Sequence, residues 1–446
     1  MIALPPDCDG EGIAPGVAVQ AVLPEGRSRP ARLEASLELA FSSNYMHFTC
    51  IIEARLNSQA YLVVALSIAC AQAGGIHRAS AEDVPDIVWK TNAHGGNVLS
   101  LTFSEDGKLL ATGAEDRTGK VWMLPQGALL TTVGTPDAWV DSIALYPPDN
   151  IMLTGGDDGG VRVWGLHSGS YLYGNSPDES TIVWSIAMGS NGSIAIGKSR
   201  PNIDLLTAMG DFTLEGHSAD VYSVTFSRDA SRMASASADG TARLWRVSDG
   251  AALQVLTAHS SISTNEDDTV INPVNDVDFS PDGSLLVTSG SDGTARLWRT
   301  SDGSQVRVLR TGSGDSAKFA SDGKSLFTVA GGTINFWRVS DGSLLASYGA
   351  GAGPLAVTRD GKYFAYGRGD GVVVFAHVPL WVDSITQANG KAVLNWQGGS
   401  GLYQVQARRE MDKRDWHNLG APTRRTTFTH ALSSQFFYRV ISIPTN

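Results

Sequence analysis

Short segments of alternating polar and apolar residues run through the middle of the chain. In "VYSVTFS", Tyr222, Val224 and Phe226 point to one face of an extended strand, and the residues between them point to the other. Asp-Gly pairs follow several such segments, as in "EDGK" (105–108), "PDGS" (281–284), "SDGK" (321–324) and "RDGK" (359–362). Because Gly readily adopts a positive φ, Asp-Gly is typical of two-residue hairpin turns. The pattern therefore predicts antiparallel strands joined by tight turns.

The alternating segments belong to a repeat. The octapeptide "DGTARLWR" occurs at Asp239–Arg246 and again at Asp292–Arg299. Strands that end in tryptophan recur with spacings of 42, 81, 53 and 39, at Trp122, Trp164, Trp245, Trp298 and Trp337, and a further copy ends at Phe375. The spacing of 81 spans two units, which predicts a degenerate copy near Val183–Leu206, and the spacing of 53 is one unit plus an insertion.

Seven copies of about 40 residues, each with four short strands, indicate an all-β protein. We expect residues 84–376 to form a seven-bladed β-propeller. Counting strands from Val98 leaves the last copy with only three, ending at Phe375, while Asp86–Lys90 is an unassigned strand before the first copy. We expect this strand to pair with Val372–Phe375, because closing the ring removes exposed strand edges.

The repeat resembles the WD-repeat propellers. In that family a His, a Ser or Thr, an Asp and the strand-ending Trp form a hydrogen-bonded tetrad inside a blade, and such a buried network is tolerable only when it is complete. The resemblance implies three tetrads: His94, Thr112, Asp116 and Trp122; His217, Ser235, Asp239 and Trp245; and His259, Thr288, Asp292 and Trp298.

Four copies depart from the family pattern. The copy of Trp164 retains Thr154 and Asp158 without a matching His. The copies of Val183–Leu206, Trp337 and Phe375 lack most of the tetrad, so we expect apolar packing to hold those blades together.

The resemblance also implies a partner-binding rim on one face of the propeller. Its members are Asn97, Leu99, Glu115, Trp139, Asp141, Asp157, Ile182, Trp184, Asp220, Tyr222, Pro273 and Asn275. Trp139 and Trp184 come from adjacent copies and are expected to lie side by side. Large aromatic residues surrounded by polar groups are where binding energy concentrates. The alternative is that both indoles only cap the rim of the channel.

The first 73 residues differ from the repeat region. Residues 1–45 are rich in Pro, Gly and Ala, and Ala60–Ala71 is an uncharged run of 12 residues, too short to span a bilayer. The run is typical of a secretory signal peptide over 46–73 that is cleaved before Gly74, which predicts a secreted or periplasmic protein. Met46 is a candidate translation start, and the protein is cytoplasmic if the leader does not function.

Residues 380–446 lie outside the repeat. The segments "KAVLNW", "LYQVQARR", "DWHNLG" and "QFFYRVIS" each read as a strand, and together they resemble a small fibronectin type III-like β-sandwich, a type often appended to secreted bacterial proteins. About six strands fit this stretch. The resemblance implies a role in adhesion or spacing.

Charge and composition exclude several classes of site. The net charge of −11 argues against a nucleic-acid partner, and all three cysteines (Cys8, Cys50 and Cys70) precede the repeats. "GSIAIGKS" (192–199) fits the phosphate-loop pattern, but Pro201 follows and no helical period appears, so we interpret it as a blade strand. The acidic stretch at Asn265–Asp268 lacks the spacing of a calcium loop. We expect neither metal nor cofactor.

Two functions remain open at this point. The first is a non-enzymatic, monomeric scaffold that binds a protein or peptide on the Trp139 and Trp184 face. The alternative is an extracellular or periplasmic hydrolase or lyase that acts on a polysaccharide or lactone. Its carboxylates would be Asp141, Asp157 and Asp220 at the mouth of the channel.

Overall fold

The computed structural model describes most of the chain beyond residue 84. It describes residues 48–56, 60–68 and 85–442, apart from residues 136, 176, 177, 179, 258, 263–268, 350, 389–390, 400–401, 409–416 and 432–436. The chain divides into two compact units, Met1–Ile76 and His77–Asn446. The acidic stretch at 265–268 and the cleavage position expected before Gly74 lie outside the described residues.

In the first unit, β1 (Phe48–Leu56) and β2 (Ala60–Ile68) pair as an antiparallel hairpin. The apolar run of the expected signal peptide therefore forms most of β2 in this structure. The prediction of export stays a prediction, because a hairpin in the folded chain does not test where the chain is sent.

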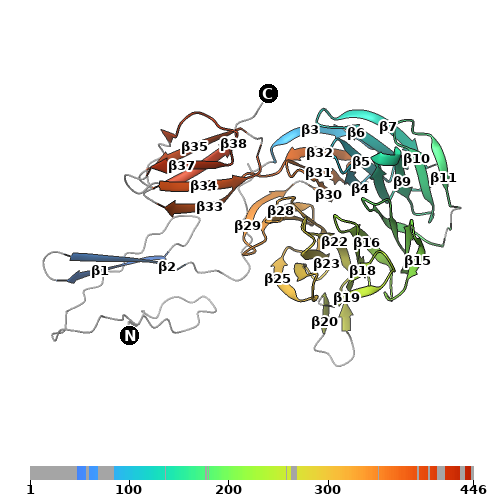
Figure 1. The fold of residues 1–446 in the computed structure, drawn as a ribbon, viewed down its shortest axis with the longest axis horizontal. Coiled ribbons are helices and arrows are strands. Elements are labelled where there is room, and N and C mark those ends of the chain that lie inside the picture. Colours follow the sequence, from blue (N-terminus) through green and yellow to red (C-terminus); the bar gives the residue numbers. More distant parts are fainter. Residues whose placement is uncertain are drawn as a thin grey trace. The chain divides into compact units, whose positions relative to one another are not determined.

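The described residues of the second unit contain seven four-stranded antiparallel sheets, which we call blades 1–7, arranged around a central axis (Figure 1). Blades 1–3 consist of β4 (Val98–Phe103), β5 (Leu109–Ala114), β6 (Thr118–Met123) and β7 (Ala128–Gly134); β8 (Ser142–Tyr146), β9 (Ile151–Gly155), β10 (Val161–Gly165) and β11 (Tyr171–Gly174); and β12 (Val183–Met188), β13 (Ile194–Lys198), β14 (Arg200–Thr207) and β15 (Gly210–Leu214). The phosphate-loop lookalike thus forms β13 and a turn into β14, as its strand interpretation predicted.

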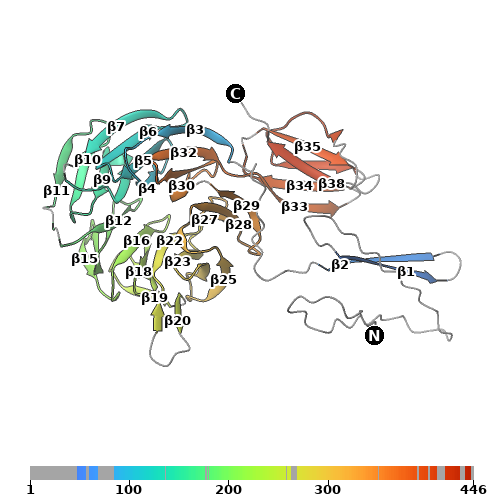
Figure 2. The same ribbon diagram turned by 180° about the vertical axis from the view of Figure 1, so that it is seen from behind.

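Blades 4–6 follow the same order along the chain. They consist of β16 (Val221–Phe226), β17 (Arg232–Ser237), β18 (Ala242–Arg246) and β19 (Ala252–Leu256); β22 (Val274–Phe279), β23 (Leu285–Gly290), β24 (Thr294–Arg299) and β25 (Gln305–Arg310); and β26 (Gly314–Phe319), β27 (Ser325–Ala330), β28 (Thr333–Arg338) and β29 (Leu344–Gly349). The insertion before blade 5 forms a hairpin of β20 (Ser260–Ile262) and β21 (Thr269–Ile271), which projects from the ring (Figure 2). The described residues include one short helical turn, η1 (Pro147–Asp149).

Both ends of the repeat region meet in blade 7. β30 (Ala352–Val357), β31 (Tyr363–Arg368) and β32 (Val372–His377) supply three strands, and β3 (Ile87–Asn92) pairs with β32 as the fourth. Trp89 lies opposite Phe375 in this pairing. The predicted seven blades and their closure by the strand before the first copy are therefore confirmed.

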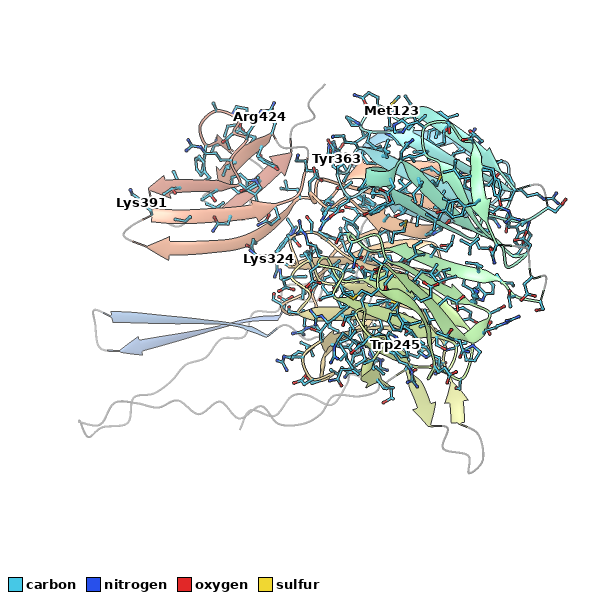
Figure 3. The ribbon with its side chains drawn as sticks, turned by 45° about the vertical axis from the view of Figure 1, so that its right-hand side comes forward. Met123, Trp245, Lys324, Tyr363, Lys391 and Arg424 are labelled. Atoms are coloured by element: carbon cyan, nitrogen blue, oxygen red, sulfur yellow. The ribbon has the colours of Figure 1, made fainter. Side chains whose placement is uncertain are left out.

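Each blade packs against its neighbours through a separate apolar core. Seven buried clusters each contain side chains from two adjacent blades. Trp245, labelled in Figure 3, lies in the cluster between blades 3 and 4. This arrangement follows from the alternation along each strand, since successive side chains point to opposite faces of the sheet and both faces meet a neighbour.

The Asp-Gly turns are longer than the two residues that the sequence predicted. In blade 1, residues 104–108 connect β4 to β5, and Gly107 has a φ of +70°. Ser104 Oγ donates to Asp106 Oδ1 at 2.7 Å, and the Lys108 N–H donates to the same oxygen at 3.1 Å. The Asp106 carboxylate thus accepts hydrogen bonds from two residues of its own turn. The Asp-Gly motif is therefore part of a five-residue connection.

Ring closure depends on the packing of Trp89. Its ring stacks on Phe375, with centroids 5.4 Å apart, and contacts Trp122 at 6.2 Å. We expect Trp89→Ala to lower the free energy of unfolding by about 2 kcal/mol, since the replacement removes a large, half-buried aromatic side chain. Urea unfolding measures this change. Val88→Ala, on the same strand but 37% exposed, is the control. Equal losses for the two variants would contradict a closing role for Trp89.

Residues 381–442 form two further antiparallel sheets. Within the described residues, β33 (Trp381–Ala388), β34 (Lys391–Gln397) and β37 (Thr427–Ala431) make one sheet, and β35 (Tyr403–Arg408), β36 (His417–Asn418) and β38 (Phe437–Ser442) make the other. Leu394 and Trp396 of the first sheet are buried with Tyr403 and Val405 of the second. The two sheets therefore share one apolar core.

Candidate functional site: the channel mouth

The three expected tetrads bring their four members together. In blade 4, Trp245 Nε1 donates to Ser235 Oγ at 2.9 Å, and His217 lies 2.8 Å from both Ser235 Oγ and Asp239 Oδ2. A neutral imidazole satisfies this chain of bonds: Nε2 accepts from the hydroxyl, and Nδ1 donates to the carboxylate. Blade 1 repeats the arrangement, with 2.7 Å from His94 Nε2 to Thr112 Oγ1 and 3.1 Å from Nδ1 to Asp116.

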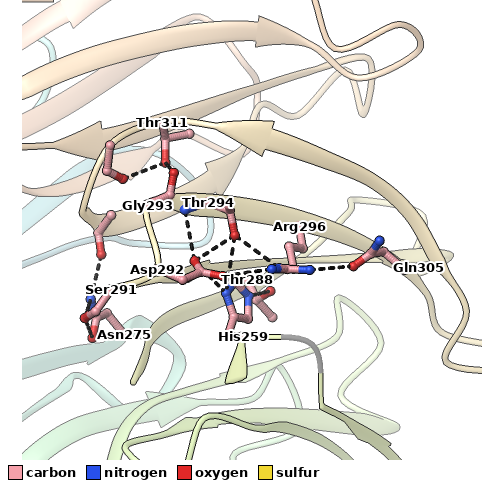
Figure 4. Close-up of polar contacts among 12 residues, drawn as sticks. His259, Asn275, Thr288, Ser291, Asp292, Gly293, Thr294, Arg296, Gln305 and Thr311 are labelled. Carbon is pink, nitrogen blue, oxygen red and sulfur yellow. Dashed lines mark hydrogen bonds and ion pairs between the residues drawn. The ribbon is translucent and has the colours of Figure 1, made fainter. Parts of the chain in front are cut away.

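Blade 5 shows the same network with one further donor, Arg296 (Figure 4). His259 Nε2 lies 2.7 Å from Thr288 Oγ1 and its Nδ1 lies 3.1 Å from Asp292, while Thr294 Oγ1 and Arg296 Nη2 also donate to Asp292, at 2.7 and 2.8 Å. Burial lowers the pKa of His259, and likewise of His94, although the neighbouring Asp acts to raise it. These imidazoles are neutral and fully bonded, which makes them parts of the scaffold.

One recurrent member of these networks was not predicted from the sequence. A Thr two residues after the Asp donates to it at 2.6 Å from Thr118 and at 2.7 Å from Thr241 and from Thr294. The signal was present in the repeated octapeptide, in which Thr keeps this spacing from Asp in both copies.

The blades without a full tetrad retain part of it. In blade 2, Trp164 donates to Thr154 at 2.9 Å, and Asp158 pairs with Arg162 in place of a His. In blade 6, Trp337 donates to Thr328 at 2.9 Å. The Thr328 hydroxyl was not predicted, because the turn before Trp337 is one residue shorter and shifts the spacing between the two residues.

A channel of about 740 Å³ runs along the centre of the propeller, lined by the innermost strand of every blade. We call the end at which these strands begin the upper face, and we call Asp141 and the lining residues aligned with it in the other blades mouth residues. The mouth residues are Leu99, Asp141, Trp184, Tyr222, Asn275, Asp315 and Gly353. Five of them had been assigned to the rim, and Asp315 and Gly353 had not.

The other rim residues are joined in pairs around the channel. Asn97 donates through Nδ2 to Glu115 at 2.9 Å, and the Trp139 N–H donates to Asp157 Oδ1 at 2.8 Å. The carbonyls of Ile182, Asp220 and Pro273 each accept a backbone N–H, from Ser199, Ala238 and Ser291, at 2.9 Å. Asn275 donates to Ser291 Oγ at 3.1 Å (Figure 4). Local backbone bonds thus place the rim residues on adjoining loops.

The expectation that Trp139 and Trp184 lie side by side needs correction. Trp184 packs edge-on against Tyr222 of the next blade, with ring centroids 5.7 Å apart. Within the part of the chain that the structure describes, Trp139 makes no ring contact, and it is 44% exposed. Trp184 lies at the mouth position of its blade, whereas Trp139 precedes the mouth residue of blade 2 by two positions and is not among the residues that line the channel.

Two polar atoms at the mouth are buried and lack a hydrogen-bond partner among the described residues: Oδ2 of Asp141 and Nε1 of Trp184. Burial raises the pKa of Asp141 to about 7, with further contributions from the negative charges of Asp157, Asp158 and Glu115. Burial together with Asp220 also raises the pKa of Tyr222. Unpaired buried polar groups are costly to the folded state, so their concentration at one end of the channel points to a binding surface.

A charged cluster deeper in the channel wall joins blades 4, 5 and 6. Lys318 Nζ donates to Asp276 Oδ1 at 2.8 Å, and Asp276 also accepts from Ser223 and Ser316, each at 2.8 Å. Burial raises the pKa of Asp278 to about 6, although Lys318 acts to lower it. This cluster could not be predicted from the repeat pattern, because each of its members occurs in a single copy. Within the described residues, no group of three or more His, Cys, Asp or Glu could hold a metal ion.

Comparison with known proteins agrees with this geometry. Residues 86–123, 127–165, 210–246 and 250–299 match the WD40 family, described as "WD domain, G-beta repeat". Four of the repeats thus match the WD40 repeat. The matched ranges include the three complete tetrads and begin one strand before each blade, so the first matched repeat supplies β3 to blade 7.

The repeat region is similar to several known proteins. It is 30% identical over 265 residues to guanine nucleotide-binding protein subunit beta-1 of Nicotiana tabacum, which covers 52% of this chain and 66% of that protein. It is 30% identical over 166 residues to the target of rapamycin complex subunit wat1 of Schizosaccharomyces pombe, covering 35% and 52%. It is 28% identical over 222 residues to periodic tryptophan protein 2 of Arabidopsis thaliana, covering 48% and 23%. The chain thus spans less than two thirds of each of these relatives.

Proposed function

We propose that this WD40 propeller is a non-enzymatic scaffold that binds a protein or peptide on its upper face. The observation that carries the proposal is the upper face, where Trp139 is 44% exposed and the mouth residues Trp184 and Tyr222 form an edge-to-face pair. A partner that covers this surface would bury these aromatic rings against its own side chains.

The relatives support a scaffold over an enzyme. Two of them carry names that describe subunits, a guanine nucleotide-binding protein subunit and a target of rapamycin complex subunit. The enzymatic alternative relied on Asp141, Asp157 and Asp220 acting together, but Asp157 is bound to the Trp139 N–H and the electrostatic effect of Asp220 falls on Tyr222. Nothing in these relatives favours a hydrolase or lyase.

Affinity capture tests the proposed surface. Immobilised full-length chain is incubated with fractionated native cells, and retained proteins are quantified by mass spectrometry. We expect the double variant Trp139→Ala, Trp184→Ala to retain its main partner about 30-fold less than the wild type, because central aromatic anchors carry about 2 kcal/mol or more of binding energy. Tyr173→Ala, which removes an aromatic residue 63% exposed on β11, is the matched control. Unchanged capture by the double variant would place the site elsewhere.

We also propose that the protein is exported through residues 46–73 and that residues 381–442 form a fibronectin type III-like sandwich. The sandwich is supported by the strand pairing, in which the first, second and fifth strands form one sheet and the third, fourth and sixth form the other. Export is supported by the apolar run before Ala71. The structure adds one observation: within the described residues, no helix is long and apolar enough to cross a bilayer. Mass spectrometry of the protein isolated from native cells would report its mature N-terminus, which export places at Gly74.

A further inference from the structure

The upper face carries uncompensated negative charge where blades 1 and 2 meet. The Val140 N–H donates to the carbonyl of Ala114 at 3.1 Å and the Asp141 N–H donates to that of Gly155 at 3.0 Å, so backbone bonds hold Asp141 between the loops that carry Glu115 and Asp157. Burial raises the pKa of Asp141, and the charges of Asp157 and Glu115 add to this effect. In the part of the chain that the structure describes, none of the three forms a salt bridge. Their recorded side-chain partners are neutral: the Asn97 amide for Glu115 and the Trp139 N–H for Asp157.

Three cations of blades 1–3 are bound elsewhere. Arg162 pairs with Asp158, and Arg200 pairs with Asp178 at 2.7 Å. Lys120 Nζ donates to the carbonyl of Ala93. These cations therefore do not neutralise Glu115, Asp141 or Asp157.

Aromatic surface accompanies the negative charge. Trp139 is 44% exposed, and its backbone N–H fixes its loop against Asp157. Across the mouth, Trp184 and Tyr222 present an edge-to-face pair. An exposed indole beside carboxylates favours a guanidinium or ammonium group, because the face of the ring and the carboxylates both attract a cation.

We propose that the partner inserts a cationic segment, with an arginine or lysine side chain held between Trp139 and the carboxylates of Glu115, Asp141 and Asp157. This inference rests on the proposed function and specifies the partner by its charge. A divalent metal ion is not favoured, because the described residues hold no group of three such ligands.

Fluorescence anisotropy with the full-length chain tests the proposal. The probes are three fluorescein-labelled peptides of one length: Gly-Ser-Gly-Arg-Gly-Arg-Gly-Ser-Gly, the same peptide with citrulline for arginine, and the same peptide with glutamate. Citrulline keeps the shape of arginine and removes its charge. We expect the arginine peptide to bind at least about tenfold more tightly than the citrulline peptide and the glutamate peptide not to bind.

Variants locate the binding on the surface. We expect Trp139→Ala to weaken binding of the arginine peptide about tenfold. We expect the same loss of affinity for the double variant Glu115→Gln, Asp157→Asn. Asp302→Asn is the matched control, because it removes an exposed carboxylate from the turn between β24 and β25. Circular dichroism confirms that each variant is folded. Raising the salt concentration should weaken the arginine peptide and leave any neutral binding unchanged.

The outcomes separate this inference from the proposed function. Binding that depends on Trp139 but is equal for arginine and citrulline would overturn the cationic partner and leave the scaffold in place. Failure of every peptide, or loss of binding in Asp302→Asn equal to that in the double variant, would also overturn the inference. The capture experiment with Trp139→Ala, Trp184→Ala would still decide the scaffold independently.

Discussion

Asp141→Asn is expected to raise the free energy of unfolding by about 2–4 kcal/mol at pH 8, taking about 1.4 kcal/mol per pKa unit. The pKa of Asp141 is raised from 3.8 to about 7, chiefly because the carboxyl is buried and also because Asp157, Asp158 and Glu115 repel its charge. Ionisation of Asp141 above pH 7 therefore works against the folded state. The amide keeps the shape of the carboxyl and removes the charge.

The gain from asparagine should depend on pH in a defined window. Below pH 4 the carboxyl is protonated in both the folded and the unfolded chain, and the variant gains little. Between pH 4 and 7 the unfolded carboxyl loses its proton while the folded one keeps it, so the stability of the wild type falls relative to that of the variant. Above pH 7 both states are ionised and the difference stays constant.

Urea unfolding at pH 4.5, 6, 7 and 8 measures this profile for the wild type and for Asp141→Asn. Asp302→Asn, an exposed carboxylate on another turn, serves as the control and should show no growing gain. A gain that is the same at every pH, or a loss of stability at pH 8, would contradict the assigned cause. Asp141→Asn should also weaken binding of the arginine peptide. A buried group that destabilises the fold is typical of a site where function needs that group.

His217→Leu is expected to lower the free energy of unfolding by about 3 kcal/mol, which is typical when one partner of a buried charged hydrogen bond is removed. His217 is 6% exposed and bonds to both Ser235 and Asp239. Although burial acts to raise it, hydrogen bonds from His217 and Thr241 hold the pKa of Asp239 well below its ordinary value. Without the imidazole, the carboxylate and the Ser235 hydroxyl lose their shared partner.

Urea unfolding at pH 7 measures the loss, with His167→Leu as the control. His167 lies exposed in the turn after β10, where it bonds to Asn150. Its replacement should therefore change the free energy of unfolding by less than about 0.5 kcal/mol. The tetrad interpretation predicts a clear difference between the two variants. Similar small losses would show that the tetrad contributes specificity of packing without measurable stability.

The local sequence was sufficient to predict the repeats and the order of the strands. The strand before the first copy pairs with β32 as expected, because a seventh sheet with three strands leaves one edge open and one strand unassigned. The tetrad members meet for a similar reason: they lie at fixed distances along three hydrogen-bonded neighbouring segments of the same blade, so their separation depends on strand register alone.

Contacts between blades could not be predicted from the repeat pattern. The Trp184–Tyr222 contact and the Lys318–Asp276 pair each join neighbouring blades, and each occurs once. A repeat pattern reports what the copies share, so it carries no signal for residues that differ between copies. The position of Trp139 relative to Trp184 depends on how far each loop extends from the axis, which the alignment of copies does not encode.

The sequence by itself determined the number of blades, their closure and the three polar networks inside them, since all of these follow from the alternation of residues along strands and from spacing within one copy. Only the tertiary structure decided the chemistry of the channel mouth. Burial of Asp141 and the approach of carboxylates from two blades arise when the sheets pack radially, and both depend on distances between residues of different copies.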